Sequence, residues 1–172
     1  MRELTIEMET MTVTIRDPAR ERALWGHGLT SPVTSEVVIA AHCRTCGERR
    51  GKPRGARRCD DGAYFRVDEW SNPCGHIDYY EAVAQEAAEF LRLRQDVYLR
   101  GLKPRDVIPV RVVTQLKVVT GRVIVTKVHL EARSIDFINA AVPEDRGTLE
   151  VRHLILPKLE TQRARVLAGG TR

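Results

Sequence analysis

The alternation of hydrophobic and polar positions predicts a chain built mainly from short strands. From Glu3 to Arg16 apolar and polar residues largely alternate, with Leu4, Ile6 and Met8 on one side, as expected for a strand with one buried face. Further alternating or β-branched runs predict strands over 36–41, 63–70, 107–130 and 149–156. Thr120-Gly121 interrupts the third of these runs and indicates a hairpin turn there.

Two segments carry helical signals. Asp17 can cap a short helix that Pro18 begins and that ends after Trp25. A much longer helix is predicted from Asp78 to Gly101, because Asp78 and Glu81 have the spacing of a capping box and Gly101 supplies a stop. Apolar residues keep helical spacing between them, and Glu86 and Glu89 are expected on the polar side of this helix.

One long helix between groups of short strands indicates an α+β fold with a mainly antiparallel β-sheet. We expect an N-terminal part, residues 1–78, and a C-terminal part, residues 79–172, that contains the helix and the β-rich region. No apolar run approaches the roughly 18 residues that cross a bilayer. The N-terminus has no hydrophobic segment typical of a secretion signal, which favours a cytoplasmic location.

The positive charge of the chain is concentrated in one window. Overall, 28 Lys and Arg oppose 23 Asp and Glu, a net charge of +5. Residues 41–58 contain seven of these cations and a single acidic residue, Glu48, so the rest of the chain is close to neutral. The Gly, Pro and Arg content of 44–58 predicts a loop, and a basic loop is either a solvated segment or a phosphate-binding surface.

All four cysteines fall within 32 residues, around that same window. Cys43-Arg-Thr-Cys46-Gly47 is a CxxCG unit, whose tight turn can direct both sulfurs at one ion. Cys74-Gly75-His76 offers a second pair of ligands about thirty residues later. Zn²⁺ takes four nitrogen or sulfur ligands in a tetrahedron, so Cys43, Cys46, Cys74 and His76 are predicted to bind a structural zinc ion.

This arrangement resembles the zinc-ribbon and zinc-knuckle group of small metal sites over about residues 36–80, although Cys-x-His stands where a ribbon usually has CxxC. Cys59 and His42 are competing ligands, so a site made of four cysteines stays open. Two disulfides are disfavoured because a chain with no export signal is expected where thiols stay reduced. Redox activity of the CxxC pair is disfavoured because no thioredoxin-like βαβ pattern surrounds it.

The sequence favours a non-enzymatic protein. His129-Leu130-Glu131 has the His-x-Glu form found in zinc deaminases, but the cysteine pair lies upstream instead of following it. No phosphate-binding glycine loop, no nucleophile elbow and no HExxH motif is present. Four protein ligands would also leave the zinc without an open position for water.

The predicted function is nucleic-acid binding by a zinc-stabilised protein. Zinc would hold the basic loop at the metal end of the fold, where its guanidinium groups match phosphate oxygens. Tyr64 and Phe65 could stack on unpaired bases, although core packing of their strand is the favoured explanation for both. The residues predicted to contact DNA or RNA are Arg44, Arg49, Arg50, Lys52, Arg54, Arg57 and Arg58.

A structural or adaptor role in a larger assembly, such as a phage particle, is the alternative. Residues 107–156 have neither a basic patch nor a catalytic cluster, and the edges of their predicted sheet could pair with another subunit. The zinc would then be purely structural, the basic loop would meet an acidic protein surface, and the chain could form homo-oligomers.

Overall fold

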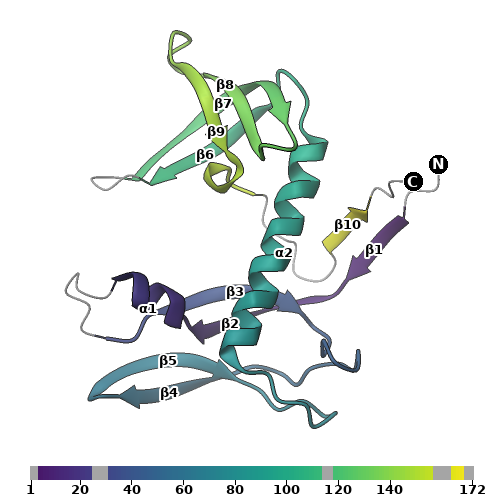
Figure 1. Cartoon of the computed structure of the whole chain (residues 1–172), viewed down its shortest axis with the longest axis vertical. Helices are drawn as coiled ribbons and strands as arrows, with labels where there is room; N and C mark the ends of the chain where they lie inside the picture. The colour runs from purple at the N-terminus through teal and green to yellow at the C-terminus, as the bar shows by residue number, and fades with distance from the viewer. Residues whose placement is uncertain (1–3, 25–30, 114–117, 157–163, 169–172) are drawn as a thin grey trace. The chain divides into compact units, whose positions relative to one another are not determined.

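The computed structural model describes residues 4–24, 31–113, 118–156 and 164–168 (Figure 1). In chain order the elements are β1 (Leu4–Met8), β2 (Thr10–Arg16), α1 (Pro18–Leu24), β3 (Thr34–Ala40), β4 (Arg54–Asp60), β5 (Ala63–Glu69), α2 (Tyr80–Gly101), β6 (Val107–Val113), β7 (Val118–His129), β8 (Ser134–Asn139), β9 (Arg146–Glu150), the 3₁₀ helix η1 (Val151–His153) and β10 (Ala164–Ala168). The fold is therefore α+β, with two α-helices in the described ranges, and every strand pair whose register is defined is antiparallel.

The chain forms two compact units, and the boundary between them lies within α2. The described residues of 5–91 form most of the first unit, and those of 92–158 form most of the second. A further two-stranded sheet pairs β1 with β10. No helix in the described part of the chain is long and apolar enough to cross a membrane.

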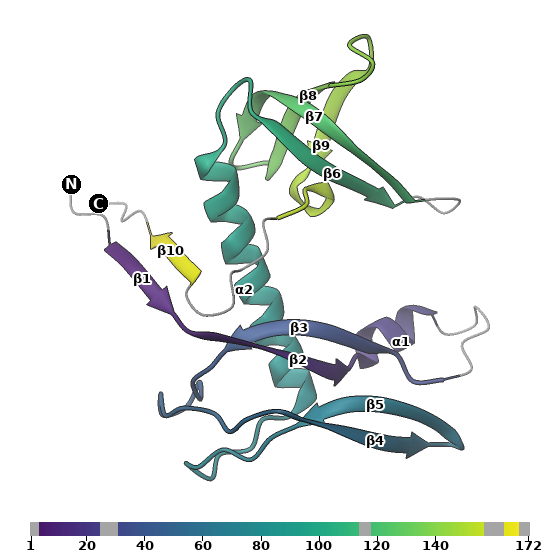
Figure 2. The same cartoon turned by 180° about the vertical axis from the view of Figure 1, so that it is seen from behind.

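The first unit contains two antiparallel strand pairs and the first turns of α2. β2 pairs with β3, and β4 pairs with β5 (Figure 2). The core lies between the β2–β3 pair and α2, and its buried members are Val13, Ile15, Ile39, Val83 and Ala87. Burying a side chain such as Ile39, which is fully inaccessible to solvent, contributes about 1.5–3 kcal/mol.

The second unit is a four-stranded antiparallel meander, in the order β6-β7-β8-β9. One face of this sheet packs against the last turns of α2 and against η1. The buried residues are Leu99, Ile108, Val110, Val123, Val125, Ile135, Val151 and Leu154. Pro109 lies in the edge strand β6, where its missing N–H costs no ladder hydrogen bond.

Both predicted helices form, although their first turns differ in detail. Asp17 caps α1, because its Oδ1 accepts a hydrogen bond from the Arg20 N–H at 3.0 Å. The helix α2 begins at Tyr80, two residues after the predicted cap. The Asp78 carboxylate is instead occupied by Arg50, Trp70 and Asn72.

The strands predicted over 36–41 and 63–70 form as β3 and β5. The strand predicted from Glu3 to Arg16 is instead divided into β1 and β2, which belong to different sheets, and the predictions for the second unit partly fail. Thr120-Gly121 is not a turn, because Gly121 pairs with Val110 inside β7. Val113, the last described residue of β6, pairs with Val118, the first residue of β7. The predicted strand 149–156 is also wrong beyond Glu150, where η1 begins, and β8 was not predicted at all.

The predicted basic loop over 44–58 ends earlier than expected. Its second half is β4, which joins β5 in a hairpin through Asp61 and Gly62. Both turn residues have positive φ, 47° and 78°, as a two-residue type I′ turn requires. The favourable turn chemistry and the apolar residues of β5 outweigh the poor strand propensity of the Arg- and Gly-rich β4 segment.

Candidate metal centre

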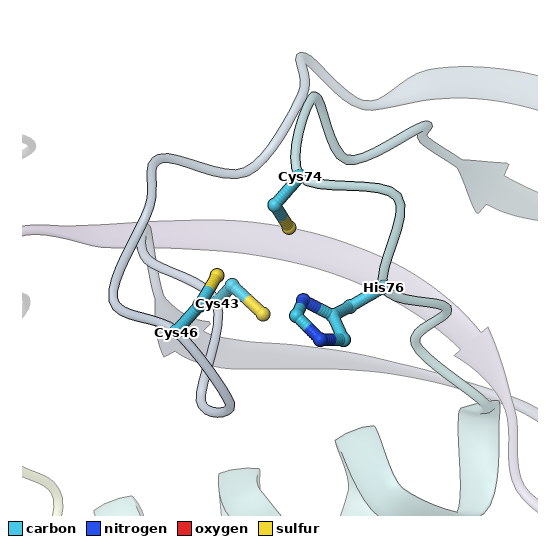
Figure 3. Close-up of side chains that lie close together, drawn as sticks. All are labelled: Cys43, Cys46, Cys74 and His76. Carbon is cyan, nitrogen blue, oxygen red and sulfur yellow. The ribbon is translucent and has the colours of Figure 1, made fainter.

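Cys43, Cys46, Cys74 and His76 converge in the first unit (Figure 3). Their ligand atoms all lie within 4.8 Å of one another. Around a tetrahedral zinc ion, bond lengths of about 2.0–2.3 Å separate the ligand atoms by roughly 3.5–4 Å. The four residues therefore lie close to the arrangement that a single ion would require.

The first pair of cysteines lies on a tight turn that follows β3. The Gly47 N–H donates to the Cys43 carbonyl at 2.8 Å, and the Cys43 N–H donates to the Glu48 carbonyl at 2.7 Å. Gly47 has a φ of 76°, a conformation that costs glycine little and other residues more. This explains why a glycine follows the second cysteine of the CxxC unit.

The second pair lies on the turn between β5 and α2. The Gly75 N–H donates to the Asn72 carbonyl at 2.9 Å, and Gly75 has a φ of 77°. The Asn72 side-chain amide closes the same turn, since its Nδ2 donates to the His76 carbonyl at 2.8 Å. Cys74 and His76 are thus directed inward from a backbone that is fixed by its own hydrogen bonds.

The electrostatic environment favours a thiolate on Cys43. The N–H groups of Cys46 and Thr45 point at its sulfur and lower the pKa of the Cys43 thiol to about 7. At Cys74 the His76 N–H acts in the same direction, but burial and the neighbouring cysteines outweigh it and raise the pKa of that thiol. The Cys43 sulfur therefore ionises readily, whereas Cys74 holds its proton until a cation compensates the charge.

The two competing ligands lie elsewhere. Cys59 is an exposed residue of β4, directly opposite Tyr64 of β5. His42 forms an isolated β-bridge with Arg49 and is outside the cluster. All four cysteines have free thiols in the structure.

Arg50 ties the two ligand turns to α2. Its side chain is 1% exposed and forms ion pairs with Asp78 at 2.9 Å and with Glu86 at 2.8 Å. Its Nη1 also donates to the Ala40 carbonyl at the end of β3. Burial raises the pKa of Asp78, but hydrogen bonds from Arg50, Asn72 and Trp70 outweigh it and lower that pKa overall.

Glu86 was predicted to lie on the polar, solvent-facing side of α2, and this network explains why it is largely buried instead. Its side chain is only 13% exposed, and its Oε1 accepts hydrogen bonds from the Ala40 N–H and from Arg50. Arg50 was predicted to contact nucleic acid, but its guanidinium is buried and fully engaged within the protein.

Three more of the predicted phosphate-binding arginines have acidic partners. Arg44 pairs with Glu89, Arg49 with Glu9, and Arg58 with Glu69. These pairs are exposed, so each adds little stability, but each reduces the positive charge available to a ligand. Lys52, Arg54 and Arg57 have no carboxylate partner among the described residues.

The solvent-facing side of the β4–β5 hairpin carries a different basic surface from the one predicted. Arg57 lies directly opposite Arg66, and the guanidinium carbon of Arg57 is 4.2 Å from the centre of the Tyr64 ring. Tyr64 is 64% exposed, whereas Phe65 lies on the other face, near Arg16. We call Arg57, Tyr64 and Arg66 the hairpin surface.

Arg66 was missed because it lies outside the basic window of the sequence. The two-residue turn at Asp61-Gly62 was the available signal, because it sets the register that places Arg66 opposite Arg57. Like charges directly opposite each other destabilise a sheet, so this pair is an unfavourable choice unless an anion compensates it.

The His-x-Glu segment forms a structural contact. His129 Nε2 lies 2.9 Å from Asp136 Oδ2, and Asp136 Oδ1 accepts a hydrogen bond from the Thr148 hydroxyl. These three residues join β7, β8 and β9, and the metal-type cluster of the described chain lies in the other unit.

Comparison of the chain with protein-family models, with curated proteins and with solved structures finds no match. The class of this protein is therefore defined by its geometry, an α+β protein with a Cys₃His cluster that could bind a metal ion.

Proposed function

We propose that Cys43, Cys46, Cys74 and His76 bind one structural Zn²⁺ ion. Three sulfurs and one imidazole are a donor set that zinc prefers, and two turns that bring two ligands each are typical of zinc ribbons and knuckles. Four protein ligands leave no position for substrate or water, so the ion would stabilise the fold of the first unit instead of performing chemistry.

We further propose that this unit binds nucleic acid through the hairpin surface. The observation that carries the proposal is the direct pairing of Arg57 with Arg66 beside the exposed Tyr64 ring. Neither arginine has an acidic partner in the described ranges, so both guanidinium groups are free to bind phosphates. The exposed Tyr64 ring, which contacts the Arg57 guanidinium, offers a stacking surface for a base.

Charge reversal tests this function. The variant Arg57→Glu/Arg66→Glu should bind labelled oligonucleotides more weakly than the wild type. The slope of log K against log salt concentration should also become shallower, by about one unit for each phosphate that the protein no longer neutralises. The control Arg122→Glu/Arg146→Glu makes the same charge change at exposed positions of the second unit. Equal affinities of the two variants would contradict the proposal.

The assembly role has separate support in the second unit. Val113, Val118 and Val119 lie at the described ends of β6 and β7 and are 62%, 50% and 44% exposed. Clustered exposed valines at a strand end are typical of surfaces that another protein covers. If this role is correct, Val113→Lys/Val119→Lys should reduce the size of the assembly in light scattering and leave metal content unchanged.

A further inference from the structure

A groove with a volume of about 720 Å³ lies in the first unit, on a different part of the hairpin from the hairpin surface. It runs along the residues that lead into β4, the end of β5 and the start of α2. Gly51 permits the close approach of the two chain segments here, because a Cβ at that position would be 2.0 Å from the Ser71 carbonyl oxygen. Ser71 itself lines the groove.

The acidic residues of the groove are already engaged with the protein. Asp68 Oδ2 accepts the Thr14 N–H at 2.7 Å, and Glu69 pairs with Arg58. The Asp78 carboxylate is held by Arg50. Glu69 and Asp78 are therefore each paired with an arginine, whereas Asp68 is bonded only to a neutral backbone N–H.

The basic residues of the groove are not engaged in this way. Lys52 and Arg54 both line it, both are exposed, and neither has an ion-pair partner in the part of the chain that the structure describes. Lys52 and Arg54 are thus the two cations of the groove that remain available to an anion.

Two aromatic side chains complete the lining. The Trp70 indole N–H donates to Asp78 Oδ2 at 2.8 Å, and the Tyr80 hydroxyl donates to the Asp68 carbonyl at 3.0 Å. Because both polar groups are satisfied within the protein, the rings contribute mainly apolar surface to the groove. Aromatic surface beside two free cations suits a ligand that combines a planar ring with a phosphate.

We propose that this groove binds a nucleotide unit, with its phosphate at Lys52 and Arg54 and its base against Trp70 and Tyr80. The unit can come from a free mononucleotide or from an unpaired position in a strand. The second source rests on the proposed function, because it requires that the protein binds nucleic acid.

Trp70 provides a direct probe of the groove. The chain has two tryptophans, so Trp25→Phe leaves Trp70 as the single indole fluorophore. Titration of the full-length, metal-loaded variant with AMP or UMP should quench Trp70 fluorescence, and adenosine or inorganic phosphate should bind at least about tenfold more weakly. A titration in which inorganic phosphate competes as well as AMP, or in which AMP causes no change, would overturn the proposal.

Matched variants in the same background separate the groove from the hairpin surface. Lys52→Gln/Arg54→Gln should weaken AMP binding at least about tenfold, whereas Arg57→Gln/Arg66→Gln should leave it unchanged. Metal content and the far-ultraviolet circular dichroism spectrum would show that both variants fold. Equal AMP affinities of the two variants would overturn the proposal.

A single-stranded oligonucleotide distinguishes the sources and the two proposals. Quenching of Trp70 by both AMP and the oligonucleotide would show that the groove accepts a nucleotide from a strand. Quenching by AMP with no oligonucleotide binding would support the groove and overturn the nucleic-acid function. Oligonucleotide binding that depends on Arg57 and Arg66, with no response of Trp70 to either ligand, would overturn the groove and leave that function standing.

Discussion

Arg50 shows how one residue can belong to a charged segment of the sequence and yet serve the interior of the fold. Its guanidinium connects Asp78, beside the second ligand turn, with Glu86 of α2 and with the end of β3. A buried arginine with two carboxylates is tolerated only because all of its N–H donors are hydrogen-bonded. Removal of Arg50 alone would leave two carboxylates in a partly buried site without a cation.

We therefore expect Arg50→Ala to destabilise the protein by about 3–5 kcal/mol, the usual cost of breaking a buried ion pair from one side. Arg57→Ala, which removes an exposed arginine from the same window, is the matched control and should change stability by less than about 0.5 kcal/mol. Urea unfolding at pH 7 measures both. Similar midpoints for the two variants would contradict the assigned role of Arg50.

The ligand set makes a second prediction at this scale. Cys74→Ser should lose the metal and unfold the first unit, because the binding energy of such a site is folding energy. Cys59→Ser removes an exposed thiol outside the cluster and should keep one metal ion per chain. Elemental analysis of the purified variants measures the metal content of each. If Cys59→Ser loses the metal and His76→Ala keeps it, the fourth ligand is Cys59 and not His76.

The four clustered residues could be predicted from the sequence because their spacing is local. CxxCG and Cys-x-His each place two ligands on one turn, so that only the meeting of the two turns depends on the fold. The roles of the arginines could not be predicted in this way. Whether Arg50 is buried, or Arg58 meets Glu69, depends on register and packing that the charge pattern does not contain.

At the scale of elements, the β4–β5 hairpin and the β6–β7 pair show what local patterns can specify. Asp61-Gly62 is a strong turn signal, and the turn forms at that position. Thr120-Gly121 is a weaker signal, and Gly121 is instead paired within β7 because Val123 and Val125 are needed in the core. The register of β6 and β7 is therefore set by the burial of apolar side chains and not by the position of a single glycine.

The contact between β7, β8 and β9 predicts a pH dependence. Hydrogen bonds from His129 and then from Thr148 lower the pKa of Asp136 below its ordinary value of 3.8. A carboxyl group whose pKa is lower in the folded than in the unfolded protein stabilises the fold above its unfolded pKa. That stabilisation is lost as the pH falls through its folded pKa.

Asp136→Asn should therefore weaken the sheet at pH 7 and have progressively less effect below pH 3.8. Amide hydrogen exchange of β7 and β8, corrected for the intrinsic effect of pH, measures the difference between wild type and variant. The control is Glu131→Gln, which neutralises an exposed carboxylate of the same unit. Asp145 is not used for this purpose because its carboxylate accepts a hydrogen bond from Asn139. A difference in protection that stays constant between pH 7 and pH 3 would contradict the assigned role of Asp136.

At the scale of the whole molecule, the chain has two hydrophobic cores and one metal-type cluster in its described residues. Val13, Ile39 and Val83 belong to one core, and Val110 and Ile135 belong to the other. The cluster lies in the first unit, where the core between the β2–β3 pair and α2 has five buried members, against eight in the core of the second unit. A small core of this kind commonly needs a metal ion or a disulfide to supplement it.

Chelation should consequently affect the two units differently. Removal of the metal should abolish protection of backbone amides in β2, β3 and β5, whereas β7 and β8 should keep theirs, because their core does not include the ligand turns. Hydrogen exchange with mass spectrometry measures both regions in one experiment. Simultaneous loss of protection throughout the chain would show that the two cores unfold as a single cooperative unit.

The most direct test of the zinc assignment is native mass spectrometry of wild-type protein that was purified under reducing conditions without added metal. We predict that each chain carries the mass of one zinc ion, and that this mass disappears in Cys74→Ser. The same spectrum reports the number of subunits and any nucleic acid retained. Freshly purified, folded protein without a bound metal ion would contradict the zinc centre on which this account depends.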